Sequence, residues 1–273
     1  MSNENPEIAQ SINAGGIQTN YHDVGTGSPV LLIHGSGPGV SAWANWRLTI
    51  PAVAKENRVI APDMVGFGFT DRPENIKYGM EVWVKHAVDL LDALEIDKVS
   101  VVGNSFGGAL ALGLAIYHPE RVDKLVLMGS VGVHFELTHG LDKVWGYEPS
   151  IENMKELLDI FAYNRAIVTD ELAELRYDAS VRPGFQESFS SMFPAPRQQG
   201  VDDMTFPNEK IKAIDKQTLI IHGREDDVIP FDNALKLFDL IETSQLHGFR
   251  QCGHWTQIEQ AETFNKLVSD FLA

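Results

Sequence analysis

The chain has 273 residues, of which 44% are hydrophobic and 22% are charged, and its formal net charge at pH 7 is −16. This composition is typical of a globular protein that buries a core without disulfides or a structural metal. So acidic a chain is a poor candidate for binding nucleic acid or an anionic membrane surface, because both carry negative charge. A single cysteine, a polar N-terminus and the lack of a long apolar run lead us to expect a cytoplasmic protein without signal peptide or membrane span.

Short apolar runs rich in Val, Ile and Leu recur along the chain and predict buried parallel strands. These runs are Val30–Ile33, Arg58–Ala61, Val99–Val102, Lys124–Met128, Thr218–Ile221 and Gln245–Phe249. The residues near Gly16–Tyr21 predict an antiparallel edge. Longer segments with helical periodicity, such as Glu81–Leu94, lie between the runs. The alternation predicts the α/β class, with a mostly parallel sheet covered by helices on both sides, as in the α/β-hydrolase fold.

The alternation of strands and helices stops between about Ser130 and Phe206. Apolar residues at helical spacing form three stripes there: Ile151, Met154, Leu158 and Phe161; Leu172, Leu175 and Ala179, with Thr169 as N-cap; and Phe185, Phe189 and Phe193. We therefore expect a core domain of residues 1–130 and 209–273 and a helical lid of residues 131–208. The lid would cover the C-terminal edge of the sheet, where open α/β sheets bind ligands.

One motif in the predicted core carries a nucleophile. Gly103-Asn104-Ser105-Phe106-Gly107 fits the pattern G-x-S-x-G, which on its own arises by chance and also suits a glycine-rich turn with an idle serine. Here a predicted strand precedes the motif and a predicted helix follows it. That context is what a nucleophile elbow requires, so we expect Ser105 to be a catalytic nucleophile.

A serine hydroxyl needs a base, and the base needs an acid to orient it. Of the nine histidines, His254 follows the last predicted strand and suits the base, whereas His34 and His222 suit packing at the rim of the sheet. Asp226 follows the strand Thr218–Ile221 and suits the acid, with Asp227 as the alternative. The chain order of serine, aspartate and histidine is that of α/β-hydrolases.

A glycine-rich loop, His34-Gly35-Ser36-Gly37-Pro38-Gly39, follows the first predicted parallel strand. Its position predicts an oxyanion hole made of the backbone N–H groups of Ser36 and Phe106. The loop does not satisfy G-x-G-x-x-G, and the chain has no G-x-x-x-x-G-K-[ST] segment. No histidine or cysteine spacing suits a metal site. We therefore expect neither a cofactor nor a metal.

Beyond these patterns, the chain closely resembles the meta-cleavage product hydrolases of bacterial aromatic degradation over nearly its whole length. The segments that carry the resemblance are HGSGPG (34–39), WANWRLTIP (43–51), APDMVGFGFTDRP (61–73), GNSFGG (103–108), VWGYEPS (144–150), FAYNR (161–165), LRYDAS (175–180), RPGFQESF (182–189), HGRED (222–226) and CGHWTQIE (252–259). Within that family the chain is most similar to the branch that acts on 2-hydroxymuconic semialdehyde and its alkyl ketone analogues.

The resemblance implies hydrolysis of the C5–C6 bond of a 2-hydroxy-6-oxo-hexa-2,4-dienoate, after the enzyme has ketonised the dienol. The products would be 2-hydroxypenta-2,4-dienoate and formate or another small carboxylic acid. The resemblance also assigns Arg176 to the substrate carboxylate and implies a homo-oligomer. It places five further residues at the substrate: Asn104, Asn45, Trp255, Phe161 and Gly37.

One segment departs from the family pattern. Residues 197–212 read RQQGVDDMTFPNEKIK, without the tryptophan and the longer acidic helix start that the family usually carries. The resemblance therefore does not predict the structure of the end of the lid. Two other functions stay open as well. The same triad serves a carboxylesterase or lactonase, and a ligand receptor on a hydrolase fold can keep all three residues.

Overall fold

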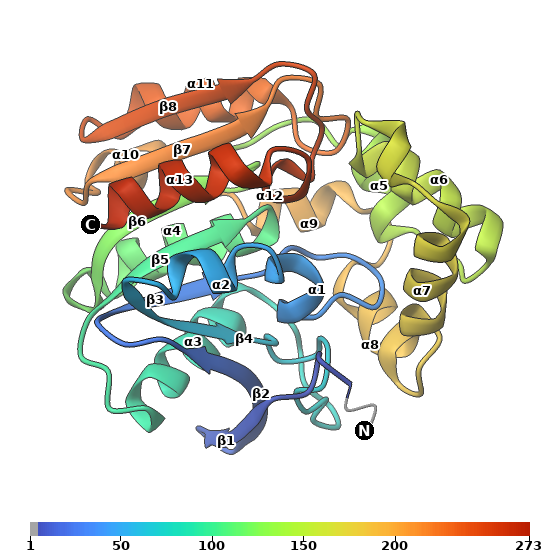
Figure 1. The fold of residues 1–273 in the computed structure, drawn as a ribbon, viewed down its shortest axis with the longest axis horizontal. Coiled ribbons are helices and arrows are strands. Elements are labelled where there is room, and N and C mark those ends of the chain that lie inside the picture. The colour runs from blue at the N-terminus through green and yellow to red at the C-terminus, as the bar shows by residue number, and fades with distance from the viewer. Residues whose placement is uncertain (1–4) are drawn as a thin grey trace.

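The computed structural model describes residues 5–273, and within them eight strands form one sheet in the order β1-β2-β4-β3-β5-β6-β7-β8 (Figure 1). The strands are β1 (Gln10–Ala14), β2 (Ile17–Val24), β3 (Ser28–Ile33), β4 (Asn57–Pro62), β5 (Val99–Asn104), β6 (Val122–Met128), β7 (Thr218–Gly223) and β8 (Ser244–Phe249). The pairs β1–β2 and β2–β4 are antiparallel, and the other five are parallel. Every run predicted as a strand is confirmed, as is the antiparallel edge.

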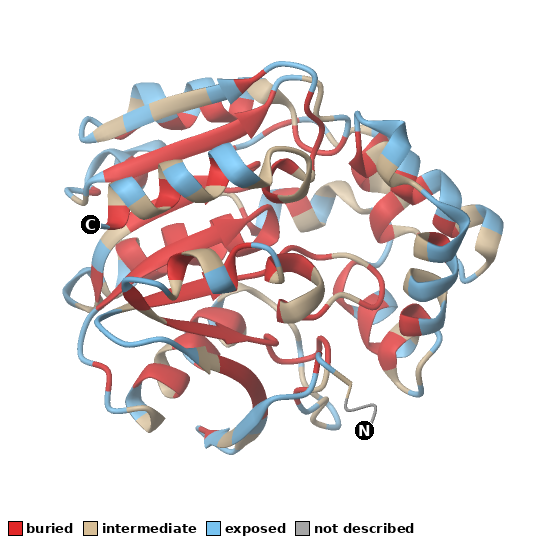
Figure 2. Ribbon diagram, in the orientation of Figure 1, coloured by how far each residue is buried: buried red, intermediate tan, exposed pale blue. Residues whose placement is uncertain are grey.

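The two faces of the sheet bury different helices because successive side chains of a strand point to opposite sides. In β3, Leu31 and Ile33 join one apolar cluster, and Val30 and Leu32 join the other. The first cluster contains α3 (Met80–Ala93), α4 (Phe106–Tyr117), α10 (Asn208–Lys212) and α11 (Phe231–Leu240). The second contains α1 (Ala42–Trp46), α2 (Ile50–Val53) and α13 (Ala261–Leu272), and the short α12 (Thr256–Glu259) precedes α13. Figure 2 shows the resulting burial of the central strands.

The chain between β6 and β7 is helical until α10 returns it to the sheet. Its helices are α5 (His139–Trp145), α6 (Ile151–Phe161), α7 (Asp170–Ser180), α8 (Phe185–Met192) and α9 (Gln198–Asp203). Short 3-10 turns occupy Pro119–Arg121 and Arg165–Ile167. Figure 1 shows α5 to α8 gathered at one end of the sheet, on the right of the view.

Side-chain caps explain where these helices begin. The hydroxyl of Ser150 accepts a hydrogen bond from the third residue of α6, and Thr169 Oγ1 accepts one from Leu172 N, which confirms the predicted cap. In α6, Met154, Leu158 and Phe161 are buried as predicted. The stripe predicted for α7 is wrong at Leu175, which is 56% exposed, since Ala173 and Ala179 carry the burial of that helix.

The segment that departs from the family pattern folds as α9 and α10. Its first residues are tied to the start of the helical segment. Arg197 Nη1 lies 3.0 Å from Asp142 Oδ1, and the side-chain amide of Gln198 bonds the backbone at both Phe135 and Leu137. Among residues 5–273 no helix is both long enough and apolar enough to cross a membrane.

Candidate active site

The strand β5 ends in a sharp turn that presents Ser105. Ser105 has φ 55° and ψ −114°, a conformation that costs a non-glycine residue about 1–3 kcal/mol. Neighbouring glycines make the turn possible, because a Cβ at Gly103 would lie 2.2 Å from Gly107 O. A Cβ at Gly107 would in turn lie 2.3 Å from Ile33 O. The backbone here therefore has the geometry of the predicted elbow, with Phe106 as the first residue of α4 and its N–H free of any intrahelical partner.

A buried carboxylate and imidazole lie beyond the ends of β7 and β8. His254 Nδ1 donates to Asp226 Oδ2 at 2.7 Å, and the side chains are only 6% and 1% exposed. Asp226 Oδ1 accepts from the backbone N–H groups of Val228 and Ile229 at 2.8 and 2.9 Å. Asp227, the alternative acid, is exposed. The hydrogen bond fixes His254 with its proton on Nδ1, which leaves Nε2 free to accept a proton.

The charge state of Asp226 follows from these contacts. Burial by itself raises the pKa of this carboxyl. The charge of His254 and the hydrogen bonds from two histidine side chains outweigh burial and hold the pKa of Asp226 below its usual range. Asp226 is therefore a carboxylate throughout the physiological pH range, as an orienting acid must be.

The second histidine is His222, which the sequence analysis assigned to packing at the sheet rim. It is fully buried at the end of β7, and its Nε2 lies 3.0 Å from Asp226 Oδ2. The spacing of four residues between His222 and Asp226 was visible in the sequence. This spacing did not predict the contact, because the two side chains meet only where the loop after β7 turns back towards the strand.

The end of β6 lies between the serine and the acid–base pair. Met128 O accepts from Ser105 N at 2.8 Å, and Gly129 N donates to Ile221 O at 3.0 Å. A Cβ at Gly129 would lie 3.4 Å from both Asp226 Oδ2 and His254 Nδ1. The carboxyl ends of the parallel strands β5, β7 and β8 thus bring the three predicted triad residues to one edge of the sheet.

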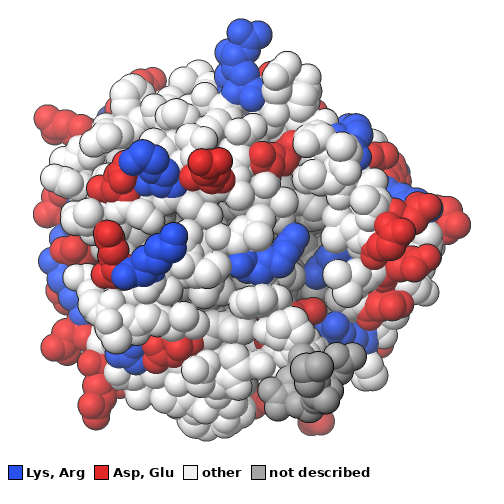
Figure 3. Space-filling model, in the orientation of Figure 1, with Lys and Arg blue, Asp and Glu red and all other residues white. Residues whose placement is uncertain are grey.

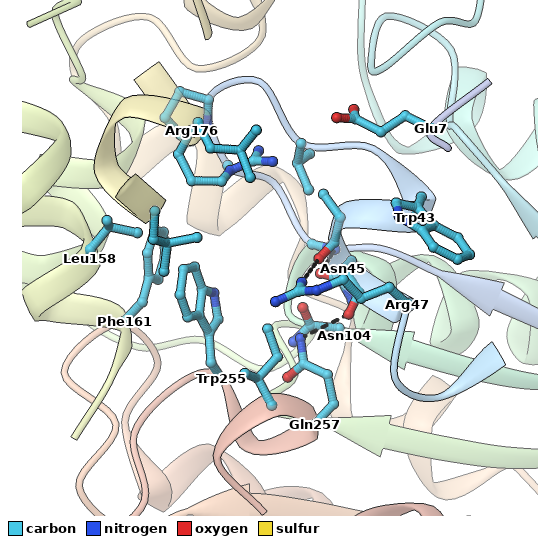
Figure 4. A pocket seen from close by; sticks show the side chains of 18 of the residues that line it. Glu7, Trp43, Asn45, Arg47, Asn104, Leu158, Phe161, Arg176, Trp255 and Gln257 are labelled. Atoms are coloured by element: carbon cyan, nitrogen blue, oxygen red, sulfur yellow. Dashed lines mark hydrogen bonds between the residues drawn. The ribbon is translucent and has the colours of Figure 1, made fainter. Parts of the chain in front are cut away.

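A cavity of about 290 Å³ opens at this edge. Eight of the eleven residues singled out from the sequence line it: Ser36, Gly37, Asn45, Asn104, Phe161, Arg176, His254 and Trp255. Five of them, Asn45, Asn104, Phe161, Arg176 and Trp255, are labelled in Figure 4. The other three, Ser105, Phe106 and Asp226, do not line it. Ser105 lies directly behind the lining, since its Cβ is 3.5 Å from the Cβ position of Gly35.

A cation without a carboxylate partner among the described residues and an unpaired amide donor lie in this cavity. Arg176 Nη2 donates to Gly39 O at 2.7 Å, and among residues 5–273 no carboxylate forms an ion pair with it. Burial lowers the pKa of Arg176 to about 10, so the guanidinium stays charged at neutral pH. Asn45 is buried, and its Nδ2 has no hydrogen-bond partner among these residues. Buried donors of this kind favour an anionic ligand.

Arg47 is a second cation in the cavity, which the sequence analysis passed over. It follows α1, and its Nη1 donates to Ala44 O at 2.8 Å. Within residues 5–273 it too has no carboxylate partner, whereas Arg182 is paired with Glu7 at 3.1 Å. Figure 4 shows Arg47 and Arg176 pointing into the same space. In Figure 3 basic side chains lie in and beside the central hollow of this face, and acidic ones gather over α6 and α7.

Aromatic side chains form the apolar wall. Phe161 stacks on Trp255 with ring centroids 5.1 Å apart and on His254 with centroids 5.9 Å apart. A Cβ at Gly37 would lie 4.0 Å from Phe161 Cζ, so the glycine loop and α6 approach each other in the cavity lining. Trp145 Nε1–H donates to Ser36 Oγ at 3.0 Å and ties α5 to the same loop.

Among residues 5–273, no group of three or more His, Cys, Asp and Glu side chains is placed to bind a metal ion.

Comparison with known proteins agrees with this geometry. A family model of the alpha/beta hydrolase fold matches residues 28–261. A 2-hydroxy-6-oxo-2,4-heptadienoate hydrolase of Pseudomonas putida is 63% identical over 100% of this chain and 99% of its own. A 2-hydroxymuconate semialdehyde hydrolase of a Pseudomonas species is 62% identical over 98% of this chain and 95% of its own. The crystal structure of a meta-cleavage product hydrolase from Pseudomonas fluorescens IP01 superposes with a TM-score of 0.98 at 63% identity, covering 98% of each chain. The fold, the strand-end site and these relatives agree that the chain belongs to the α/β hydrolases and, among them, to the meta-cleavage product hydrolases.

Proposed function

We propose that this enzyme hydrolyses the C5–C6 carbon–carbon bond of 2-hydroxy-6-oxo-hexa-2,4-dienoates, namely 2-hydroxymuconic semialdehyde or its 6-alkyl ketone analogues. The names of the two relatives that are more than 60% identical support this substrate class. One observation in the structure carries the proposal. The cavity that His254 lines also holds the Arg176 guanidinium, which has no carboxylate partner among residues 5–273, and the unpaired Nδ2 of Asn45. A simple esterase needs a cavity next to the catalytic histidine, but it does not need a buried site for an anion.

The anion site explains how a carbon leaving group departs. Arg176 and Asn45 hold the substrate carboxylate, and Asn104, which precedes the serine, lines the same cavity. A substrate fixed at one end presents C6 to the reacting groups at the other, which replaces a bimolecular encounter with a positioned one. The ketonised form of the substrate has a carbonyl at C2 conjugated with the C3–C4 double bond. This system accepts the electron pair of the breaking bond.

The triad residues then act in the order that their geometry allows. Ser105 Oγ attacks C6, and its proton passes to His254 Nε2 while the N–H groups of Ser36 and Phe106 stabilise the oxyanion. The C5–C6 bond breaks, and its electron pair moves through C4 and C3 onto the C2 oxygen. This enolate oxygen is protonated as His254 gives up its proton, and 2-hydroxypenta-2,4-dienoate leaves. Water, activated by His254, cleaves the acyl group from Ser105 as formate or a small carboxylate.

The decisive experiment follows the visible absorbance of 2-hydroxymuconic semialdehyde and of its 6-methyl ketone, with p-nitrophenyl acetate as a comparison substrate. We expect fast bleaching of a dienoate and slow ester hydrolysis. Ser105→Ala abolishes cleavage and leaves ketonisation detectable. Turnover of the ester alone would favour a carboxylesterase, and tight binding of the dienoate without turnover would favour a receptor.

Arg176 provides a separate test of the carboxylate site. Arg176→Ala removes charged hydrogen bonds worth about 1.5–3 kcal/mol each, so kcat/KM for the dienoate falls at least about tenfold. Arg176→Lys keeps the charge and loses the planar fork, so it recovers part of that loss. Neither variant alters p-nitrophenyl acetate hydrolysis, since that ester has no carboxylate. An equal loss of kcat/KM on the dienoate and on the ester would show that Arg176 does not bind the substrate carboxylate.

The assembly and location of the enzyme belong to the same proposal. We propose a cytoplasmic homo-oligomer, on the resemblance to the family and on the single, buried cysteine of the chain. Light scattering on a size-exclusion column measures the mass in solution. A mass equal to the 30.3 kDa of one chain would contradict the oligomer.

A further inference from the structure

The orienting carboxylate of the triad has more hydrogen-bond donors than a triad needs. Asp226 Oδ1 accepts two backbone N–H groups, at 2.8 and 2.9 Å. Its Oδ2 is shared between two imidazoles: His254 Nδ1 at 2.7 Å and His222 Nε2 at 3.0 Å. One histidine comes from the loop after β8 and the other from the end of β7. The second imidazole has no part in the proton transfers derived above.

The contacts of His222 fix its tautomer. Its Nε2 lies 3.0 Å from Asp226 Oδ2 and 3.0 Å from Ile229 O, and both of these atoms can only accept. The ring proton must therefore lie on Nε2. The other ring nitrogen, Nδ1, is buried without a hydrogen-bond partner among residues 5–273. Protonating it would bury an N–H group with no acceptor, so His222 is a neutral donor.

Packing holds this ring in place. His222 is fully buried, and the ring of Phe231 on α11 meets it edge-on with centroids 5.6 Å apart. The titratable groups next to Asp226 include the buried thiol of Cys252, which also interacts with Glu225 and Glu259. The carboxylates of Glu225 and Glu259 accept hydrogen bonds from the backbone N–H groups of Cys252 and Gly253, respectively. Burial raises the pKa of Cys252 to about 12, so it stays a neutral thiol.

We propose that His222 is a positioning residue, whose Nε2–H fixes Asp226 Oδ2 and takes up part of the hydrogen-bonding capacity that this oxygen offers to His254. The inference rests on the proposed triad. A carboxylate with a second donor on the same oxygen is less basic, and it stabilises the protonated form of His254 less strongly. Without the donor, Asp226 would draw a proton onto His254 earlier as the pH falls.

Two matched substitutions test this role. His222→Gln keeps an N–H donor near the position of Nε2, whereas His222→Met fills similar space without a donor. We expect His222→Met to move the acid limb of the kcat/KM profile upward by about one pH unit and to lower kcat about tenfold. We expect His222→Gln to keep the wild-type acid limb. An unchanged acid limb in folded His222→Met, or an equal shift in both variants, would overturn the proposal.

The same profiles measured with p-nitrophenyl acetate separate this inference from the substrate assignment. The ester uses the serine, His254 and Asp226 without the carboxylate site. If the dienoate is not a substrate, the ester profiles still decide the role of His222. If neither variant folds, the imidazole ¹⁵N resonances of the wild-type enzyme decide it. A neutral Nε2–H ring from pH 8 to about pH 5 supports the role, and a charged or Nδ1–H ring refutes it.

Discussion

Acid should destabilise this protein through two buried histidines that hold one loop. His34 Nε2 accepts from the backbone N–H of Met64 at 3.0 Å, and His86 Nδ1 accepts from the next one, Val65 N, at 3.1 Å. The remaining ring nitrogens face Gly35 O and Thr19 Oγ1. Each imidazole must be neutral to accept such a bond, and burial lowers the pKa of both to about 4.

The magnitude follows from proton linkage. In the unfolded chain these histidines have their ordinary pKa of 6.5, so between pH 6.5 and about pH 4 the unfolded state binds more protons than the folded state. Stability is therefore complete above pH 6.5 and is lost as the pH falls. Between about pH 7.5 and about pH 5, each histidine costs roughly 2 kcal/mol, or about 4 kcal/mol for the pair. Urea unfolding followed by tryptophan fluorescence measures this loss.

A matched variant separates these groups from other titrations. His86→Gln retains an acceptor for Val65 N and a donor for Thr19 Oγ1 but does not titrate. We expect the loss of unfolding free energy between the two pH values to be smaller by about 2 kcal/mol in this variant. The reasoning is refuted if His86→Gln unfolds with the same pH dependence as the wild type, since the acid sensitivity would then come from other groups.

Two further substitutions test the supports of the site. Gly103→Ala places a Cβ 2.2 Å from Gly107 O, so we expect a loss of about 1–3 kcal/mol in urea unfolding together with loss of turnover. Unimpaired turnover would show that the elbow does not require glycine. Glu259→Leu leaves the N–H groups of Gly253 and Asn164 without the carboxylate that accepts them at 2.8 and 2.7 Å. Because Glu259 is half-buried, we expect the free energy of unfolding to fall by about 1 kcal/mol. We also expect kcat to fall, since Gly253 precedes His254. An unchanged kcat would show that this contact does not position His254.

Local patterns in the sequence were enough to predict the sheet and the nucleophile turn. A buried parallel strand requires a short apolar run wherever it lies, and the elbow at Ser105 requires small residues close to the serine, so both leave a signal within a few residues. The cap at Thr169 is local in the same way. The burial of Leu175 was predicted wrongly because helical periodicity identifies an apolar stripe without specifying what covers it.

Contacts between distant segments carried no such signal. Nothing in the neighbouring sequence marks His222 or Arg47 as part of the site. His222 contacts Asp226 only because the loop after β7 turns back to the strand, and Arg47 lies near Arg176 only because both line one cavity. The sequence by itself determined the order of strands and helices, the elbow and the identity of the triad candidates, because these depend on neighbours along the chain. Only the tertiary structure decided which donors share the oxygen of Asp226 and which cations lack a carboxylate, because hydrogen bonding and charge pairing depend on distance in space.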